Sequence, residues 1–241
     1  YNNTYKNARL DTITSIPKLH QKFITGLFVT GPGKGYILTH EGCIFKVNGS
    51  FSPSDISMEY QSINYAPVSG STMGDYYQLS GVDSMNFMVC TRPKINGVTI
   101  SYLIHKKNGV YKEYSLEGLI GTLNYIYKLQ YVDVNSAYFI TVIFDMYKYN
   151  SLNDTWSKLV TPTKFGSFIF LNSKVGYAGE AYQAGQSIRK IYKTIDGGLT
   201  WTEEFTLENR FTPRIMATKD NKLYIMGENG FGQYFLLKYN P

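Results

Sequence analysis

The chain has 241 residues, of which 43% are hydrophobic and 16% aromatic, with 22 Tyr, 14 Phe and 22 Gly. Its formal charge of +6 comes from scattered lysines, which argues against a nucleic-acid partner, because nucleic-acid interfaces need a clustered basic patch. No apolar run approaches the roughly 18 residues of a membrane-spanning helix. The length fits a single domain over residues 1–241, and the aromatic and glycine content is typical of all-β proteins.

Strand-like segments recur along the whole chain. An aromatic residue inside an apolar run returns at spacings of 39 to 51 residues, at Tyr36, Phe87, Tyr138, Tyr177 and Tyr224. A second segment follows each of them, with two apolar residues before Lys or His, and it ends in Lys46, His105, Lys148, Lys193 and Lys238. An Asn or Asp then predicts a turn, at Asn48, Asn108, Asn150, Asp196 and Asn240. Four-stranded units with a period of about 40–50 residues are typical of β-propeller blades.

Two runs are apolar at successive positions, as expected for inner strands that lie between neighbouring blades. They are Tyr138–Phe144 and Phe168–Leu171. Their shortness and β-branched or aromatic content favour strand over buried helix.

The sharpest local motif is Thr194-Ile195-Asp196-Gly197-Gly198-Leu199-Thr200-Trp201. It predicts a hairpin turn in which the carboxylate accepts backbone N–H groups, a glycine takes a positive φ, and the indole packs back onto the sheet. We therefore assign structural roles to four residues: Thr194, Asp196, Gly198 and Trp201.

The last unit ends at Pro241, where a fourth strand should follow. Read from Tyr239 through Pro241 into Tyr1–Asn7, the two termini repeat the spacing of Tyr, Asn and Thr in Tyr149–Lys158. We therefore expect Thr4–Leu10 to provide the outer strand of the last unit. The result would be a closed, five-bladed β-propeller of four-stranded blades, without an exposed sheet edge.

The stretch from Val175 to Trp201 resembles the BNR-repeat, or Asp-box, propellers, and within them the photosystem II stability factor type of blade. In the other units the motif is incomplete. The third unit keeps only Asn153-Asp154-Thr155-Trp156, which is also similar to kelch-type repeats. The resemblance implies a propeller fold, but this superfamily includes sialidases, receptors, assembly factors and secreted bacterial proteins, so function does not follow from it. It is consistent with an extracellular or cell-surface location, with any signal segment removed before Tyr1.

Two enzyme classes form the alternative. A sialidase-like enzyme would need three convergent arginines, for which Arg92, Arg189 and Arg214 are the candidates, but the Arg-Ile-Pro signature of that family is absent. A five-bladed glycoside hydrolase would need a pair of carboxyl groups. Acids near the expected inner-strand ends are Asp75, Asp83, Asp133, Glu180 and Glu228. No local motif supports either class, and we assign no catalytic residue.

Metal and cofactor sites have no support in the sequence. The three histidines, His20, His40 and His105, are far apart, and His105 is expected to be a half-exposed strand residue. Cys43 and Cys90 lie in apolar runs without metal-ligand spacing, so we expect buried free thiols, with a bridge between neighbouring blades left open.

The function we expect is non-catalytic binding of a glycan or a protein partner, by a monomer or by a module of a larger assembly. Propellers present loops around a central mouth, and two loop regions combine aromatic and amide side chains, 180–186 and 227–234. The candidate ligand-binding residues are Tyr182, Gln183, Glu228, Asn229 and Tyr234.

Overall fold

The computed structural model describes residues 24–39, 42–49, 53–61, 78–92, 94–95, 98–122, 124–183, 188–208, 212–219, 222–228 and 233–240. Strands dominate this part of the chain, beside one short helix, α2 (Glu117–Ile120), and one 3-10 turn, η1 (Pro53–Asp55). The predicted all-β class is confirmed.

The strands form five antiparallel sheets that follow the chain order. The first sheet consists of β1 (Ile24–Gly31), β2 (Lys34–Thr39), β3 (Cys43–Asn48) and β4 (Ile56–Gln61). The second consists of β5 (Gln78–Asp83), β6 (Asn86–Thr91), β9 (Tyr102–Lys107) and β10 (Val110–Ser115). A small hairpin, β7 (Lys94–Ile95) with β8 (Val98–Thr99), is inserted between β6 and β9.

The remaining three sheets continue the series. The third consists of β11 (Ile126–Asp133), β12 (Ser136–Thr141), β13 (Met146–Asn150) and β14 (Thr155–Lys158). The fourth consists of β15 (Phe165–Phe170), β16 (Gly176–Glu180), β17 (Arg189–Thr194) and β18 (Thr202–Leu207). The fifth consists of β19 (Thr212–Lys219), β20 (Lys222–Glu228) and β21 (Tyr234–Tyr239).

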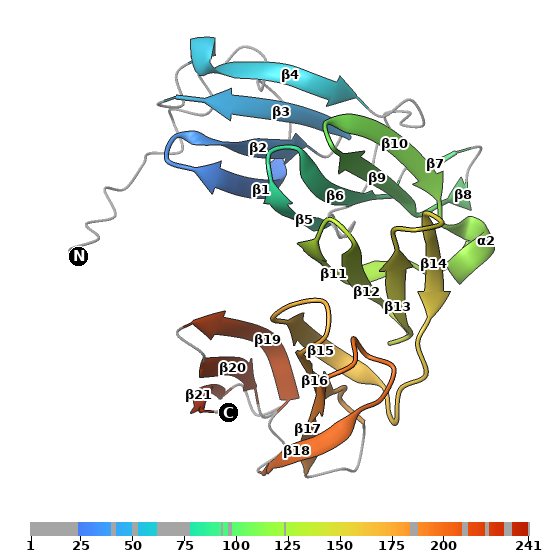
Figure 1. The fold of residues 1–241 in the computed structure, drawn as a ribbon, viewed down its shortest axis with the longest axis vertical. Coiled ribbons are helices and arrows are strands. Elements are labelled where there is room, and N and C mark those ends of the chain that lie inside the picture. The colour runs from blue at the N-terminus through green and yellow to red at the C-terminus, as the bar shows by residue number, and fades with distance from the viewer. Residues whose placement is uncertain are drawn as a thin grey trace.

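Consecutive sheets are arranged along an arc, with the first and fifth sheets at its two ends (Figure 1). Their first strands lie on the inside of the arc and contact one another in the series β1, β5, β11, β15 and β19. In the described part of the chain the fifth sheet has three strands, with β21 at its edge. The expected closing strand, Thr4–Leu10, lies outside the described residues.

The repeated aromatic residues have a common place in the sheets. Tyr36, Tyr138 and Tyr177 lie on second strands, each directly opposite a lysine of the third strand, and each packs toward the following sheet. Phe87 breaks the pattern, because it packs toward the preceding sheet with Tyr36, and Met88 faces forward instead. Successive strand residues point to opposite faces, so the aromatic residue in the sequence run is one position away from the true equivalent.

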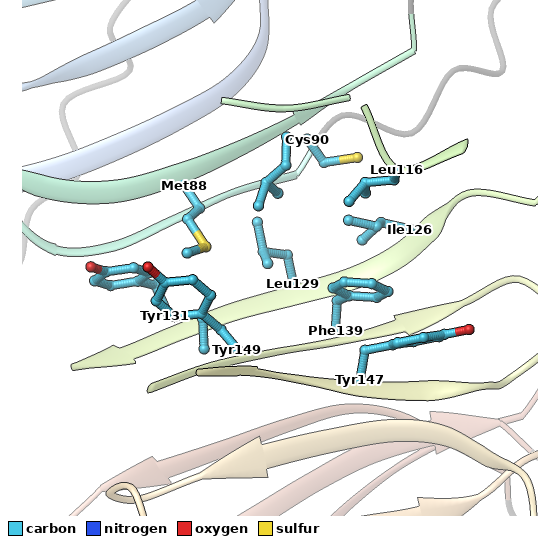
Figure 2. Packing of buried hydrophobic residues seen from close by; sticks show 11 residues of the cluster. Met88, Cys90, Leu116, Ile126, Leu129, Tyr131, Phe139, Tyr147 and Tyr149 are labelled. Carbon is cyan, nitrogen blue, oxygen red and sulfur yellow. The ribbon is translucent and has the colours of Figure 1, made fainter. Parts of the chain in front are cut away.

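The boundary between the second and third sheets shows the packing in detail. Figure 2 shows Met88 and Cys90 of β6 opposite Leu129 of β11, with Phe139 and Tyr147 beneath. Cys43 and Cys90 are both buried free thiols, as predicted. A close-packed apolar layer of this kind, rather than strand pairing, joins each sheet to the next.

Two local expectations were wrong. His105 is buried rather than half-exposed, because it faces the third sheet, where its Nε2 lies 3.2 Å from the Tyr131 hydroxyl. The run Tyr138–Phe144 is not one strand, since β12 ends at Thr141 and the chain turns before β13.

No helix in the described ranges is long and apolar enough to cross a membrane.

Candidate functional site

The antiparallel strands give the molecule two different ends. At one end, which we call the turn end, hairpin turns join first to second and third to fourth strands. At the other, which we call the pocket end, first strands begin and second strands finish. This division separates the acids singled out in the sequence. Asp83 and Asp133 close β5 and β11 at the turn end, whereas Glu180 and Glu228 close β16 and β20 at the pocket end. Asp75 lies outside the described residues.

A cavity of about 180 Å³ lies at the pocket end and is shared by the third, fourth and fifth sheets. Its walls come from the start of β11, the turn after β12, the start of β15, the segment after β16 and the start of β19. The lining residues are Tyr125, Tyr127, Val142, Phe144, Gly166, Tyr182, Thr212, Pro213 and Arg214. Four aromatic rings and one guanidinium therefore meet in one small space.

Three arginines lie in this cavity or against its lining residues, but they are not equivalent. Arg92 holds its guanidinium 3.9 Å from the Tyr125 ring centre, and Arg189 holds its own 5.3 Å from that of Tyr182. Only Arg214 lines the cavity, where Glu228 accepts hydrogen bonds from its Nε at 3.2 Å and Nη2 at 2.6 Å.

Arg189 is fully buried and donates to the carbonyl oxygens of Ile188 and Gln183, each at 3.0 Å. A sialidase-type site needs three guanidinium groups directed at one substrate carboxylate. Here Arg92 contacts the Tyr125 ring and Arg214 pairs with Glu228. Arg189 contacts the Tyr182 ring and binds two backbone carbonyls.

The candidate ligand-binding residues divide between the cavity and other places. Tyr182 lines the cavity and is 58% exposed, and Gln183 follows it, with its Nε2 3.5 Å from the Thr163 hydroxyl. Glu228 is the partner of Arg214 beside the cavity. Tyr234 is the first residue of β21, 76% exposed and outside the cavity lining. Asn229 lies outside the described residues.

Sequence reasoning missed Tyr125, Tyr127 and Phe144 as site residues, and it considered Arg214 only as part of a sialidase-type arginine triad. Tyr125, Tyr127 and Phe144 belong to the third sheet and Arg214 to the fifth, and no local motif links them. Only the tertiary arrangement brings them together.

At the turn end, the motif 194–201 forms a self-contained hydrogen-bonded turn. Asp196 accepts hydrogen bonds from the Thr194 hydroxyl and from both the backbone N–H and the hydroxyl of Thr200, at 2.6–2.9 Å. Mainly because of the Thr200 hydroxyl, the pKa of Asp196 is lowered to about 2. Gly198 has a φ of 87°, and Trp201 packs against Phe165.

A second acid at the turn end joins two sheets. Asp154, in the turn between β13 and β14, accepts hydrogen bonds from Lys112 and Tyr114 of β10 and from Tyr149 of its own sheet, at 2.5–2.6 Å. Burial alone would raise the pKa of Asp154, but these three donors, Lys112 first, lower it below its usual range. Asp154 therefore holds the second sheet against the third.

Among the described residues, no three His, Cys, Asp or Glu side chains are grouped as metal ligands would be.

Comparison with solved structures identifies the type of fold. A structure of YCF48 bound to D1 peptide matches with a TM-score of 0.57 at 13% identity, over 89% of this chain and 64% of that one. YCF48 from Cyanidioschyzon merolae matches with a TM-score of 0.59 at 14% identity, over 90% and 66%.

Two further structures match equally well. An oligogalacturonate lyase in complex with manganese gives a TM-score of 0.61 at 13% identity, over 89% of this chain and 61% of that chain. BBS1N in complex with ARL6DN gives 0.56 at 11% identity, over 92% and 67%. The chain thus spans between 61% and 67% of the length of these four structures.

All of these neighbours are β-propellers, and at such low identity the likeness shows the fold alone. No protein-family model matches the chain. No curated protein matches it either.

Proposed function

We propose that this chain is a non-catalytic binding module that holds an extended segment of a partner protein at its pocket end. The observation that carries this proposal is the shared cavity, walled by four aromatic rings and flanked by cationic side chains. Aromatic residues and arginine are the side chains that contribute most to protein recognition, because they combine large contact area with directional donors.

The size and polarity of the cavity favour a peptide. About 180 Å³ is below the roughly 300–1,000 Å³ of sites that enclose whole small molecules, and it suits a single side chain of a longer ligand. Its polar groups are three phenols, the Thr212 hydroxyl and the Arg214 guanidinium, all of which can donate hydrogen bonds. A peptide backbone provides carbonyl oxygens that accept such bonds.

Structural neighbours offer a precedent at the level of the fold. One YCF48 structure is bound to D1 peptide, and BBS1N was solved with ARL6DN. The unit 175–201 supports membership of the Asp-box propellers, and with it a secreted or cell-surface location.

Glycoside hydrolysis is the competing function, and the cavity does not favour it. Hydrolysis by this class requires two carboxyl groups about 5–10 Å apart across a cleft. The lining residues include no carboxyl group, and the adjacent Glu228 is engaged by Arg214. Aromatic walls would also suit a sugar ring, so a glycan is the second outcome that the experiment must separate.

The test is to probe a peptide array and a glycan array with the purified chain and to repeat each hit with Tyr182→Ala. We expect saturable peptide binding that weakens at least tenfold in this variant. Tyr234→Ala is the matched control, because Tyr234 is also strongly exposed but lies outside the cavity. Glycan binding alone, or turnover of chromogenic glycosides, would contradict the proposal.

We further propose that the ring closes as the sequence predicts, with Thr4–Leu10 pairing along β21. In the described part of the chain, β21 is an edge strand that pairs only with β20. The third strands of the other four sheets are each paired with a fourth strand. Deleting residues 1–10 should lower the melting temperature by roughly 5–10 °C, as expected for the loss of a paired strand. An unchanged melting temperature would count against closure.

A further inference from the structure

Phe144 has a backbone conformation that its side chain disfavours. Its φ is 68°, in the left-handed region, where a bulky L-residue costs about 1–2 kcal/mol. Among the described residues, the other non-glycine positions with positive φ are Asn108 and Asp154, and both residue types tolerate this region. Phe144 is thus the one large apolar side chain that the described structure holds there.

The surrounding backbone imposes this conformation. In the turn between β12 and β13, Phe144 donates its N–H to the Thr141 carbonyl at 2.8 Å, and Thr141 donates its own to the Asp145 carbonyl at 2.9 Å. Val142 donates to the carbonyl of Tyr125, beside β11, at 3.0 Å. The turn is therefore closed on itself and bound to the neighbouring strand. Whatever residue occupies position 144 must take the positive φ, and Gly or Asn would do so with less strain.

The fold does not use the Phe144 ring as core. Phe144 belongs to none of the five clusters of buried hydrophobic residues in the described part of the chain. Phe144 instead lines the cavity, together with Tyr125, Tyr127 and Tyr182. The strained conformation therefore places Phe144 at the cavity, and Phe144 adds no packing to the five buried clusters.

We propose that Phe144 is the specificity-determining residue of this cavity, and that its ring contacts an apolar or aromatic side chain of the bound segment. This inference rests on the proposed peptide-binding function and adds the class of side chain that the cavity accepts. Residues held in strained backbone conformations by the surrounding structure cluster at binding and active sites. The cavity therefore selects apolar side chains over polar ones of similar size.

The test uses two variants with less strain, Phe144→Asn and Phe144→Gly, and the control Ile143→Asn. Ile143 belongs to the same turn, is 52% exposed and does not line the cavity. Binding is measured by ligand-observed NMR with the N-acetyl amides of leucine, phenylalanine and glutamine, and stability by thermal melting. We expect wild type to prefer the leucine and phenylalanine amides.

In both Phe144 variants this preference should disappear, with at least a tenfold loss of affinity for the apolar amides. Their melting temperatures should lie at or above the wild-type value, and Ile143→Asn should bind like wild type. Retained preference in the Phe144 variants, or a melting temperature well below that of Ile143→Asn, would overturn the inference. If wild type binds peptides on the array but none of these amides, the inference about Phe144 is overturned while the proposed function stands. Wild type that binds no peptide at all would overturn the proposed function as well.

Discussion

The two ends of the molecule use polar and aromatic residues in opposite ways. At the turn end, Asp154 and Asp196 each accept three hydrogen bonds, and Lys148 donates to the carbonyl of Gly197 in the next sheet at 3.1 Å. At the pocket end, aromatic rings surround a cavity and Phe144 holds a strained turn. Stabilising contacts and the proposed recognition surface thus lie at separate ends of the same strands.

Replacing Asp154 should have the largest effect on stability. In Asp154→Ala, Lys112, Tyr114 and Tyr149 lose their common acceptor, and Ala disfavours the φ of 55° at this position. We expect a loss of about 2–4 kcal/mol in the free energy of unfolding, measured by urea denaturation. Asp145→Ala is the control, because its one ion pair, with the exposed Lys158, should contribute under about 1 kcal/mol. Equal losses of stability in Asp154→Ala and Asp145→Ala would contradict the expectation that Asp154 stabilises the fold more than Asp145 does.

The buried His105 should make stability depend on pH. Burial, assisted by Lys107 and Lys112 against the opposing effect of Asp154, lowers the pKa of His105 from 6.5 to about 4. Between these values the unfolded chain binds a proton that the folded chain does not, so stability falls as the pH falls from 6.5 to 4. The full effect is about 3 kcal/mol. Urea titrations at several pH values should show this slope in wild type and a flatter one in His105→Gln, and parallel slopes would exclude His105 as the source.

Asp196→Ala should destabilise the fourth sheet by roughly 1–3 kcal/mol, because the turn loses the acceptor for Thr194 and Thr200. Peptide binding should persist in the folded fraction, since this turn lies at the opposite end from the cavity. Asp196→Asn retains one acceptor oxygen, so its free energy of unfolding should lie between those of wild type and Asp196→Ala. A variant with full stability and no binding would show that the turn, and not the cavity, is the recognition site.

Tyr182→Ala should have the smallest effect on stability, within about 0.5 kcal/mol, because more than half of the side chain is exposed. Thermal melts of Tyr182→Ala and Tyr234→Ala should therefore coincide, while only the first loses peptide binding. A drop of several kcal/mol in Tyr182→Ala would mean that the pocket end carries stability too, and the contrast between the two ends would fail.

Local patterns in the sequence predicted much of the architecture. Periodic aromatic and lysine positions located the second and third strands, because residues directly opposite in a sheet share a face. The same reasoning failed at Phe87, where neighbouring positions are both apolar and only packing decides which one faces forward. It found Tyr182 but not Tyr125 or Phe144, because positive φ and a wall shared among three sheets leave no local trace in the sequence.

One contact between the third and fourth sheets bears on how the molecule opens. The Gln130 side chain of β11 donates to the Phe170 carbonyl and accepts from the Phe170 N–H, both at 2.8 Å, as a paired strand would. The Phe170 amide in β15 is therefore shielded from solvent by a residue of another sheet. In native-state hydrogen exchange it should open together with β11, so that the third and fourth sheets behave as one cooperative unit. Gln130→Ala should release this amide to exchange earlier, while the protection of β11 itself remains.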